Sequence, residues 1–482
     1  MSKQEIRPAI AAAEASVAAQ APLVAHDPNR PIYHFRPPAY WMNDPNGTIY
    51  HNGYYHVFYQ FNPYADFSHD IHWGHTRSKD LVHWEQLPVA IPPSYDLDES
   101  GVWSGCMAIN EEGRPVAFYT SVGVGRKRPF QQRAAVGDDD LLTWQPHPQN
   151  PILALGEKGV PRFEPSWRDP FIFRTAGRTF LVLGAAEGDN AHVVLFEAED
   201  GSLANWRYHG PIYTRPRSEM IFCECPNFFP LGDKFVLLLS PYAPVHYAVG
   251  VFDADRLTFT PEHAGLLDPG VGSIDLRGRL LPEPCDPRFY ATNILYDPEG
   301  NCVLLGWVRG FKNGQGWSGC LALPRLLSLG PDGLPRQRPV PALAQLRAEQ
   351  LFDGALRLDA ARQSLPAQGD ALEINARLTL QGAARTGLWL RAAEDGSRGI
   401  PIEYDGTSLR VGETTVALSS GPSVDLQIFL DRSVLEVFVN DGEQVITQVV
   451  YPERGDQGIG LFADGGEAAF ESVRVWRMAS IW

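Results

Sequence analysis

Short apolar runs, separated by polar turn formers, follow one another along most of this sequence. The runs are rich in β-branched and aromatic residues, and Gly, Pro, Asn or Asp bounds each of them, which is typical of β-strands rather than helices. The clearest runs are residues 54–61, 116–121, 180–184 and 235–240. The first two thirds of the chain therefore predict an all-β region built from many short strands.

A short motif recurs among these runs at intervals of about 60 residues. Residues 80–84 (Asp-Leu-Val-His-Trp) are echoed by 140–144, more faintly by 202–206 and again by 256–259. The motif is short enough to recur by chance, but strands on both sides of each copy favour a structural repeat. Each period has room for about four strands, the size of a propeller blade. Residues 30–335 then predict a five-bladed β-propeller.

The pattern changes after Pro339. Residues 342–365 are rich in Leu, Ala and Arg and predict a connector with some helix. Alternating strands then return, and Asp441-Gly442 between two of them predicts a hairpin. These strands are residues 372–380, 387–392, 425–430, 434–439 and 445–450. About 110 residues of this kind predict a C-terminal β-sandwich.

The predicted organisation is thus all-β, with a propeller followed by a sandwich. Its boundaries are an N-terminal extension over residues 1–29, the propeller over 30–337, a connector over 338–370 and the sandwich over 371–482. The extension is Ala-rich with Glu14 inside it, which favours an amphipathic helix or a frayed tail over a secretory signal. No apolar run approaches the ~18 residues of a membrane span.

The amino-acid composition disfavours some classes of binding partner and indicates a cellular compartment. Lys and Arg number 41 against 57 Asp and Glu, a net charge of −16, which disfavours nucleic acid or an anionic membrane as the main partner. The six cysteines are sparse and lack zinc-ligand spacing, so we expect free thiols and a cytoplasmic protein. All but three of the 12 tryptophans precede Pro339, so aromatic residues gather in the propeller.

Three acidic residues stand in distinctive local sequence. Asp44 lies within Trp-Met-Asn-Asp-Pro-Asn-Gly, Asp169 between Arg168 and a proline, and Glu224 between two cysteines. Taken singly, Asp-Pro and Asn-Gly are turn formers. The apolar surroundings can nevertheless raise the pKa of one carboxyl while hydrogen bonds keep another ionised. The three belong to different predicted blades, which the axis of a propeller can bring together, and glycoside hydrolysis needs two carboxyls of unequal pKa.

These motifs resemble those of the family 32 glycoside hydrolases, which include invertases, fructan exohydrolases and sucrose-6-phosphate hydrolases. Similar blocks, in the family's order, are residues 41–47, 58–63, 73–75, 103–105, 118–120, 168–170, 224–226, 289–291, 306–307, 316–325 and 431–438. The resemblance covers about residues 30–476. It implies a five-bladed propeller and a β-sandwich, in agreement with the repeat.

The resemblance also implies roles for the carboxylates. Asp44 matches the nucleophile that attacks the anomeric carbon of a fructosyl unit. Glu224 matches the general acid/base, and Asp169 the transition-state stabiliser that binds fructose hydroxyls. The family retains configuration, so nucleophile and acid/base should lie roughly 5–5.5 Å apart. The residues that match fructose-pocket positions are Asn43, Gln60, Trp103, Ser104 and Arg168.

Two further substrate-binding candidates have structural alternatives. Trp73 matches a family block, with core packing as an equal interpretation. Asp286 could reach the sugar at the mouth of the site or belong to a plain turn. Cys223 and Asn227 stand where many members have Trp and Asp, so the resemblance does not define the leaving-group contacts.

We therefore expect a retaining β-fructofuranosidase that acts on sucrose and short fructo-oligosaccharides without a metal or other cofactor. His69, His72 and His75 have a suggestive spacing, but on an extended segment that spacing alternates faces. A sucrose-6-phosphate hydrolase is an alternative, with residues 126–128 (Arg-Lys-Arg) as a phosphate clamp rather than a solvated loop. Fructan exohydrolase, fructosyltransferase, a propeller hydrolase acting on arabinans and a non-catalytic sugar-binding propeller are further alternatives, and a homo-oligomer stays open.

Overall fold

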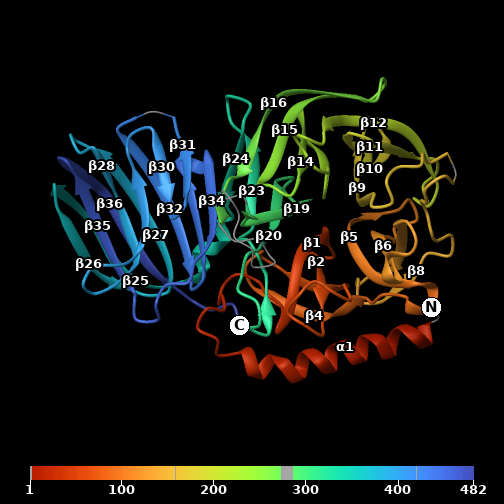
Figure 1. Cartoon of the computed structure of the whole chain (residues 1–482), viewed down its shortest axis with the longest axis horizontal. Helices are drawn as coiled ribbons and strands as arrows, with labels where there is room; N and C mark the ends of the chain where they lie inside the picture. Colours follow the sequence, from red (N-terminus) through yellow and green to blue (C-terminus); the bar gives the residue numbers. More distant parts are fainter. Residues whose placement is uncertain (1–2, 158, 273–285, 420) are drawn as a thin grey trace.

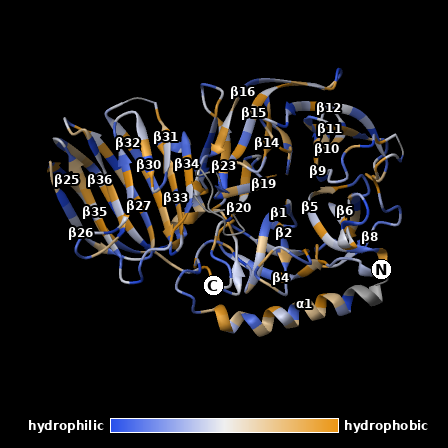
Figure 2. Cartoon of the chain, viewed as in Figure 1, coloured by the Kyte–Doolittle hydropathy of each residue, from blue (hydrophilic) through white to orange (hydrophobic). Residues whose placement is uncertain are grey.

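The computed structural model describes residues 3–157, 159–272, 286–419 and 421–482. Two β-domains lie side by side, and the helix α1 (Lys3–Val24) runs beneath the first of them (Figure 1). The first domain is a five-bladed propeller and the second a β-sandwich, as predicted. Apolar and polar residues are interspersed along the strands of both domains (Figure 2).

Each blade is an antiparallel sheet of four main strands. The first blade consists of β1 (Tyr40–His51), β2 (Tyr54–Asn62), β3 (His72–Ser78) and β4 (Trp84–Ile91). The second consists of β5 (Glu99–Ile109), β6 (Pro115–Gly123), β7 (Gln131–Gly137) and β8 (Trp144–Pro146). The third consists of β9 (Arg168–Thr175), β10 (Arg178–Glu187), β11 (Asn190–Ala198) and β12 (Trp206–Pro216).

The fourth blade consists of β13 (Asn227–Leu231), β14 (Lys234–Leu239), β15 (Val245–Asp253) and β16 (Thr258–Asp268). The fifth consists of β19 (Phe289–Tyr296), β20 (Cys302–Val308), β23 (Arg325–Leu329) and β24 (Pro335–Pro339), with β22 (Cys320–Leu321) beside β20. The short strands β17 (Val271–Gly272) and β18 (Asp286–Pro287) pair with each other. The ring closes where β21 (Trp317–Ser318) pairs in parallel with β1.

The repeated motif is the turn that leads into the outermost strand of a blade. Its tryptophans begin β4, β8 and β12, and Phe259 lies at the start of β16. The leucine of each copy has a positive φ, between 57° and 67°, which is uncommon for a residue with a side chain. Trp144 and Trp206 donate through Nε1 to the carbonyl of that leucine, at 3.1 and 3.0 Å. The 60-residue period is therefore a structural signal rather than a functional one.

The sandwich consists of two six-stranded sheets packed over an aliphatic core. In order, one sheet is β25 (Arg347–Asp359), β36 (Glu467–Met478), β27 (Ala371–Leu380), β32 (Ser423–Asp431), β33 (Val434–Val439) and β34 (Gln444–Val449). The other is β26 (Arg362–Gln368), β35 (Gly458–Asp464), β28 (Arg385–Ala392), β29 (Ile400–Tyr404), β30 (Ser408–Val411) and β31 (Thr414–Ala417). The predicted hairpin is present, because the turn η4 (Asn440–Gly442) joins β33 to the antiparallel β34.

The segment predicted as a connector, 338–370, needs correction. After the 3-10 turn η3 (Pro341–Leu346), it forms β25 and β26, which pair with β36 and β35 of the sandwich. Both are edge strands, and Leu358 alone of the 13 residues of β25 is buried. An edge strand that buries so little lacks the alternation by which a strand is recognised. The other predicted domain boundaries stay predictions.

The N-terminal segment forms the helix that its composition allowed. Ala13, Val17 and Val24 of α1 are buried, and the Glu14 carboxylate accepts the backbone N–H of Val89 in β4 at 2.8 Å. The helix therefore covers the outer strand of the first blade. No helix of the described residues is long and apolar enough to cross a membrane.

A fully buried set of charges joins the propeller to the sandwich. The Arg325 guanidinium in β23 contacts Asp268 Oδ2 at 3.0 Å and Glu436 Oε2, in the sandwich, at 2.6 Å. His34 lies between Asp431 Oδ2 (2.8 Å) and Glu436 Oε1 (3.0 Å). Burial alone would lower the pKa of His34, but its hydrogen bonds to the two carboxylates outweigh burial and raise that pKa to about 9. The sandwich segment that resembles the family's hallmark thus supplies two of the three acids of the domain interface, Asp431 and Glu436.

We predict that stability depends on the protonation of His34. Because its pKa is raised on folding, its contribution is complete below pH 6.5 and is lost as the pH rises through about 9. His34→Asn should cost about 3–5 kcal/mol of unfolding free energy at pH 6, since it breaks a buried ion pair. Urea denaturation at pH 6 and at pH 10 measures the unfolding free energy of the wild type and of His34→Asn.

The exposed pair of His209 with Glu197, at 2.8 Å, provides the matched control. His209→Asn should change the unfolding free energy by less than about 1 kcal/mol at either pH. A difference between wild type and His34→Asn that stays constant from pH 6 to pH 10 would contradict the role assigned to the buried imidazolium.

Candidate active site

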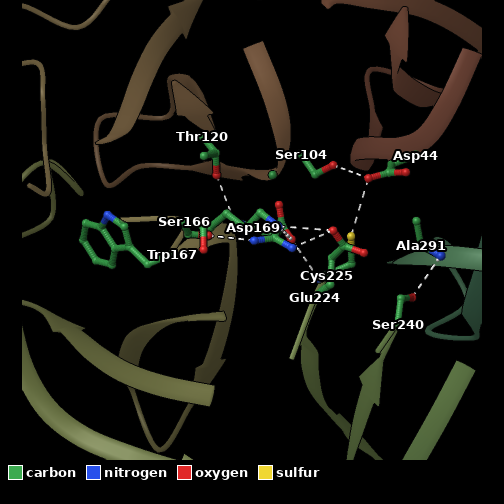
Figure 3. A network of polar contacts seen from close by, with 12 residues as sticks. Asp44, Ser104, Thr120, Ser166, Trp167, Asp169, Glu224, Cys225, Ser240 and Ala291 are labelled. Carbon is green, nitrogen blue, oxygen red and sulfur yellow. Dashed lines mark hydrogen bonds and ion pairs between the residues drawn. The ribbon is translucent and has the colours of Figure 1, made fainter. Parts of the chain in front are cut away.

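Three carboxylates from three blades, two of them buried and one partly exposed, meet near the axis of the propeller (Figure 3). The first strands of the blades lie next to one another around that axis. Asp44 comes from β1, Asp169 from β9, and Glu224 from the segment entering β13. Asp44 and Asp169 are 8% and 5% exposed, and the Glu224 side chain is 17% exposed. Residues up to 180 positions apart in the sequence therefore share one site.

Cys225 contacts two of these carboxylates and is joined by its peptide bond to the third. Its backbone N–H donates to Asp169 Oδ2 at 2.9 Å, and its thiol donates to Asp44 Oδ2 at 3.5 Å. Burial raises the pKa of this thiol well above its usual value, so it remains a protonated donor. Its positive φ of 48° turns the N–H and the side chain toward the two aspartates.

Asp44 is held by donors from β1, β2 and β5. Asn43 Nδ2 donates to Oδ1 at 3.0 Å, Gln60 Nε2 donates to Oδ2 at 3.0 Å, and the Ser104 hydroxyl also donates to Oδ2. Burial and the nearby Glu224 raise the pKa of Asp44 to about 6, although the hydrogen bonds from Ser104, Asn43 and Cys225 oppose the rise. Three predicted substrate-binding residues, Asn43, Gln60 and Ser104, thus lie against the predicted nucleophile.

Asp169 sits in a strained backbone conformation, with a φ of 67°. Its N–H donates to Thr120 Oγ1 at 2.9 Å, and Arg168 Nε lies 3.6 Å from its Oδ2. Burial raises the pKa of Asp169 to about 7; the Arg168 charge opposes that rise and the Glu224 charge adds to it. Further negative charge is unfavourable beside these carboxylates. The site therefore stabilises a substrate whose reacting carbon becomes positively charged in the transition state.

Glu224 is the most exposed of the three carboxylates and accepts the strongest donors. Arg168 approaches its Oε1 through Nη2 at 2.9 Å and Nε at 3.2 Å. The Tyr290 hydroxyl lies 2.7 Å from its Oε2. Arg168 also packs over the ring of Phe222 at 4.0 Å, so its fork is fixed in direction.

The two candidate tryptophans differ in position. Trp103 is half-buried, with its ring edge against Phe130 and the Arg126 guanidinium 5.2 Å from its centroid. Trp73 is completely buried and donates through Nε1 to the Trp103 carbonyl at 3.1 Å. Core packing is therefore the better interpretation of Trp73, which supports Trp103 from beneath.

Asp286 is neither an exposed ligand nor a plain turn. It is buried in β18, where its carboxylate contacts Arg288 at 2.6 Å and Arg309 at 3.1 Å. Arg309 in turn lies over the rings of Tyr290 and Trp307. Asp286 is therefore ion-paired with an arginine that packs on the ring of Tyr290, beside Glu224. Cys285, counted among the free thiols, lies outside the described residues.

The histidine series does not form a shared site. His69 is exposed, His72 Nδ1 donates to the Asp70 carbonyl at 2.6 Å, and His75 Nε2 lies 3.0 Å from His56 Nδ1. Burial lowers the pKa of His72 to about 4. Across the described ranges, no group of three or more His, Cys, Asp and Glu side chains is placed to hold a metal ion.

Comparison with known proteins agrees with this fold. The model of the glycosyl hydrolases family 32 N-terminal domain matches residues 34–339, and that of the family 32 C-terminal domain matches residues 343–477. The chain is 30% identical to the raffinose invertase of Escherichia coli over 477 residues, which cover 93% of this chain and 95% of the relative. It is 29% identical to the sucrose-6-phosphate hydrolase of Escherichia coli over 480 residues, which cover 93% and 94%.

A solved structure is similar over almost the whole chain. The sucrose-6-phosphate hydrolase from Lactobacillus gasseri superposes with a TM-score of 0.81 at 26% identity, covering 97% of each chain. Fold and comparisons together define a glycoside hydrolase with a propeller and a sandwich. The chain belongs to glycosyl hydrolase family 32.

Several residues around the carboxylates were missed by the sequence reasoning. Thr120, Cys225 and Tyr290 lie in blocks of the family resemblance, which could have placed them near the site. Taken alone, Cys225 is a small packing residue and Thr120 an ordinary strand residue until the blades are assembled. Tyr242, whose hydroxyl accepts from Arg168 at 2.7 Å, belongs to a loop with no motif.

Proposed function

We propose that this protein is a retaining β-fructofuranosidase that hydrolyses sucrose and short fructo-oligosaccharides through a fructosyl-enzyme on Asp44. The observation that carries this proposal is the convergence of Asp44, Asp169 and Glu224 on Cys225 in a family 32 chain. The names of its relatives, a raffinose invertase and a sucrose-6-phosphate hydrolase, support fructosides as the substrate class.

Two half-reactions follow from the roles proposed for the carboxylates. In the first, Asp44 attacks the anomeric carbon, Glu224 gives its proton to the glycosidic oxygen, and the leaving sugar departs as an alcohol. In the second, Glu224 takes a proton from water, whose oxygen attacks the same carbon and releases fructose and the free Asp44 carboxylate. Two inversions retain the configuration.

Asp169 and Arg168 complete the proposed mechanism. Asp169 lies beside Arg168 and Cys225, which hold its carboxylate in place to bind fructose hydroxyls. A negative oxygen near the reacting carbon also stabilises the oxocarbenium character of the transition state. Asn43, Gln60 and Ser104 aim the Asp44 carboxylate, so their amide and hydroxyl groups serve the nucleophile as well as the sugar.

A cytoplasmic location is part of the proposal. The five described cysteines (Cys106, Cys223, Cys225, Cys302 and Cys320) are buried free thiols, which is usual in a reducing compartment.

Replacing either proposed reacting carboxylate should abolish turnover without unfolding the chain. Asp44→Asn and Glu224→Gln are expected to lower kcat on sucrose by roughly 10³-fold or more, because each removes a covalent or proton-transfer step. Fructose release measures the loss, and thermal melting checks the fold. Asp332→Asn, at an exposed ion pair, is the control. Near-wild-type sucrose cleavage by either variant would reject the assignment.

Cys225→Ala should move the acid limb of the pH profile toward higher pH. Loss of the thiol donor raises the pKa of Asp44 beyond about 6, and a nucleophile with a higher pKa is ionised only at higher pH. A lost hydrogen bond of about 0.5–1.5 kcal/mol corresponds to roughly 0.4–1 pH unit. The measurement is kcat/KM on sucrose from pH 4 to pH 8.

The adjacent Cys223 supplies the control for that experiment. It is buried, and its thiol contacts Met220 Sδ at 3.7 Å rather than a carboxylate. Cys223→Ala should therefore leave the acid limb in place. An acid limb that moves equally in both variants would show that the shift comes from repacking and not from the thiol–carboxylate contact.

A phosphorylated substrate is the second candidate function, and one observation favours it. Arg126 lies over the half-buried Trp103, and neither Arg126 nor Lys127 has an ion-pair partner within the described chain. Two free cations near the candidate site could bind a sugar phosphate. Arg128 is engaged elsewhere, with Ser121 Oγ at 2.9 Å.

Comparing sucrose with sucrose 6-phosphate distinguishes the two functions. If the phosphate is bound, kcat/KM should favour sucrose 6-phosphate by roughly tenfold or more, and Arg126→Ala or Lys127→Ala should remove that preference. Lys234→Ala, at an exposed pair with Glu262, is the charge-matched control. Equal kcat/KM values of the wild type on the two sugars would contradict phosphate binding. Arg126 and Lys127 would then belong to a solvated loop, and sucrose would be the substrate.

A further inference from the structure

Tyr242 is the exposed member of the hydrogen-bond network around Glu224. It lies in the loop between β14 and β15, and the residue is 52% exposed. Asn227 of β13 pairs with Leu238 of β14, so the end of β14 stands beside the segment that carries Glu224. The N–H of Ser240 donates to the Glu224 carbonyl at 2.9 Å, which fixes this loop over the acid/base candidate.

Tyr242 contacts both groups that flank Glu224. Its hydroxyl accepts from Arg168 Nη2 at 2.7 Å, the nitrogen that also donates to Glu224. Its backbone N–H donates to the Tyr290 hydroxyl at 2.8 Å, and that hydroxyl lies 2.7 Å from Glu224 Oε2. Tyr242 is therefore held at two points: its side-chain hydroxyl and its backbone N–H.

The backbone of Tyr242 is strained, and the strain fixes the direction of the ring. Its φ is 64°, in the left-handed region that residues with a side chain avoid. Such a conformation persists where surrounding contacts over-determine it, and it is concentrated at functional sites. Here the N–H bond to Tyr290 and the hydroxyl bond from Arg168 supply those contacts.

Exposure rises from the nucleophile toward Tyr242. Asp44 and Asp169 are almost fully covered, Glu224 is 17% exposed, and Tyr242 is half exposed. In the proposed reaction the leaving oxygen receives its proton from Glu224, so the leaving sugar lies on the Glu224 side of the bond. An exposed aromatic ring with a polar tip offers an apolar face to the C–H groups of a sugar ring.

We propose that Tyr242 determines leaving-group specificity, with its ring as the surface on which the departing sugar packs and its hydroxyl as the tether that holds the ring to Arg168. This inference rests on the proposed fructosidase function. It predicts that the contribution of the ring depends on the leaving group being a sugar.

Two fructosides with different leaving groups test the proposal. Sucrose releases glucose, whereas methyl β-D-fructofuranoside releases methanol and has nothing to pack on the ring. Tyr242→Ala should lower kcat/KM on sucrose by roughly 10- to 100-fold more than it lowers kcat/KM on the methyl fructoside, the range for one lost apolar contact surface, because any effect through Arg168 and Glu224 falls on both substrates. Tyr242→Phe, which keeps the ring, should retain most of the wild-type ratio between the two substrates.

The outcomes separate this inference from the function on which it rests. Cleavage of either fructoside by the wild type supports the proposed function, and cleavage of neither overturns both proposals. Equal losses on the two substrates in Tyr242→Ala would overturn the leaving-group role, as would no loss on either. A ratio in Tyr242→Phe that matches Tyr242→Ala would overturn it too, because the hydroxyl would then account for the effect.

The chain offers a matched control in Tyr296. It is 39% exposed at the other end of β19 from Tyr290, and its hydroxyl donates to the Pro230 carbonyl. Tyr296→Ala removes the same exposed ring away from the carboxylates and should leave both rates unchanged. Thermal melting of all three variants checks that the fold is intact.

Discussion

Three carboxylates that lie around one residue, Cys225, and are largely removed from water impose the constraint on which the rest of the propeller depends. Like charges held together away from water are costly unless donors compensate them. Here the donors come from four blades: the amides and hydroxyl around Asp44 from the first two, Arg168 from the third, and Cys225 from the entrance to the fourth. The site therefore exists only when the ring of blades has closed.

The sandwich contributes to that closure from a distance. Its Asp431 and Glu436 meet His34, ahead of the first blade, and Arg325, in the fifth, in an interface with no access to water. A buried ion network adds little net stability compared with apolar packing, but the loss of any one partner leaves charges uncompensated. The two domains are consequently obliged to keep one mutual arrangement, and the fifth blade is held beside the first.

Backbone strain is concentrated where the chemistry is proposed. Asp169, Cys225 and Tyr242 all have positive φ angles, and each of their N–H groups or side chains points at another member of the network. Strain of this kind marks a site that is preorganised by its surroundings rather than assembled by its ligand. The deep side of the site is rigid and polar, while its outer side ends in an exposed ring.

The amino-acid sequence by itself determined the all-β class, the five-blade period and the hairpin at Asp441, and it singled out the three carboxylates as candidates. These features depend on local patterns: turn formers between apolar runs, a repeated turn with a left-handed leucine, and acids in apolar surroundings. The edge strand β25 escaped prediction because it buries one residue and so has no alternation to detect. Only the tertiary structure decided that Asn43, Gln60 and Ser104 hold Asp44, that Trp73 is core, that Asp286 is ion-paired, and that Cys225 and Tyr242 belong to the site. Those properties depend on contacts between blades, which no local pattern encodes.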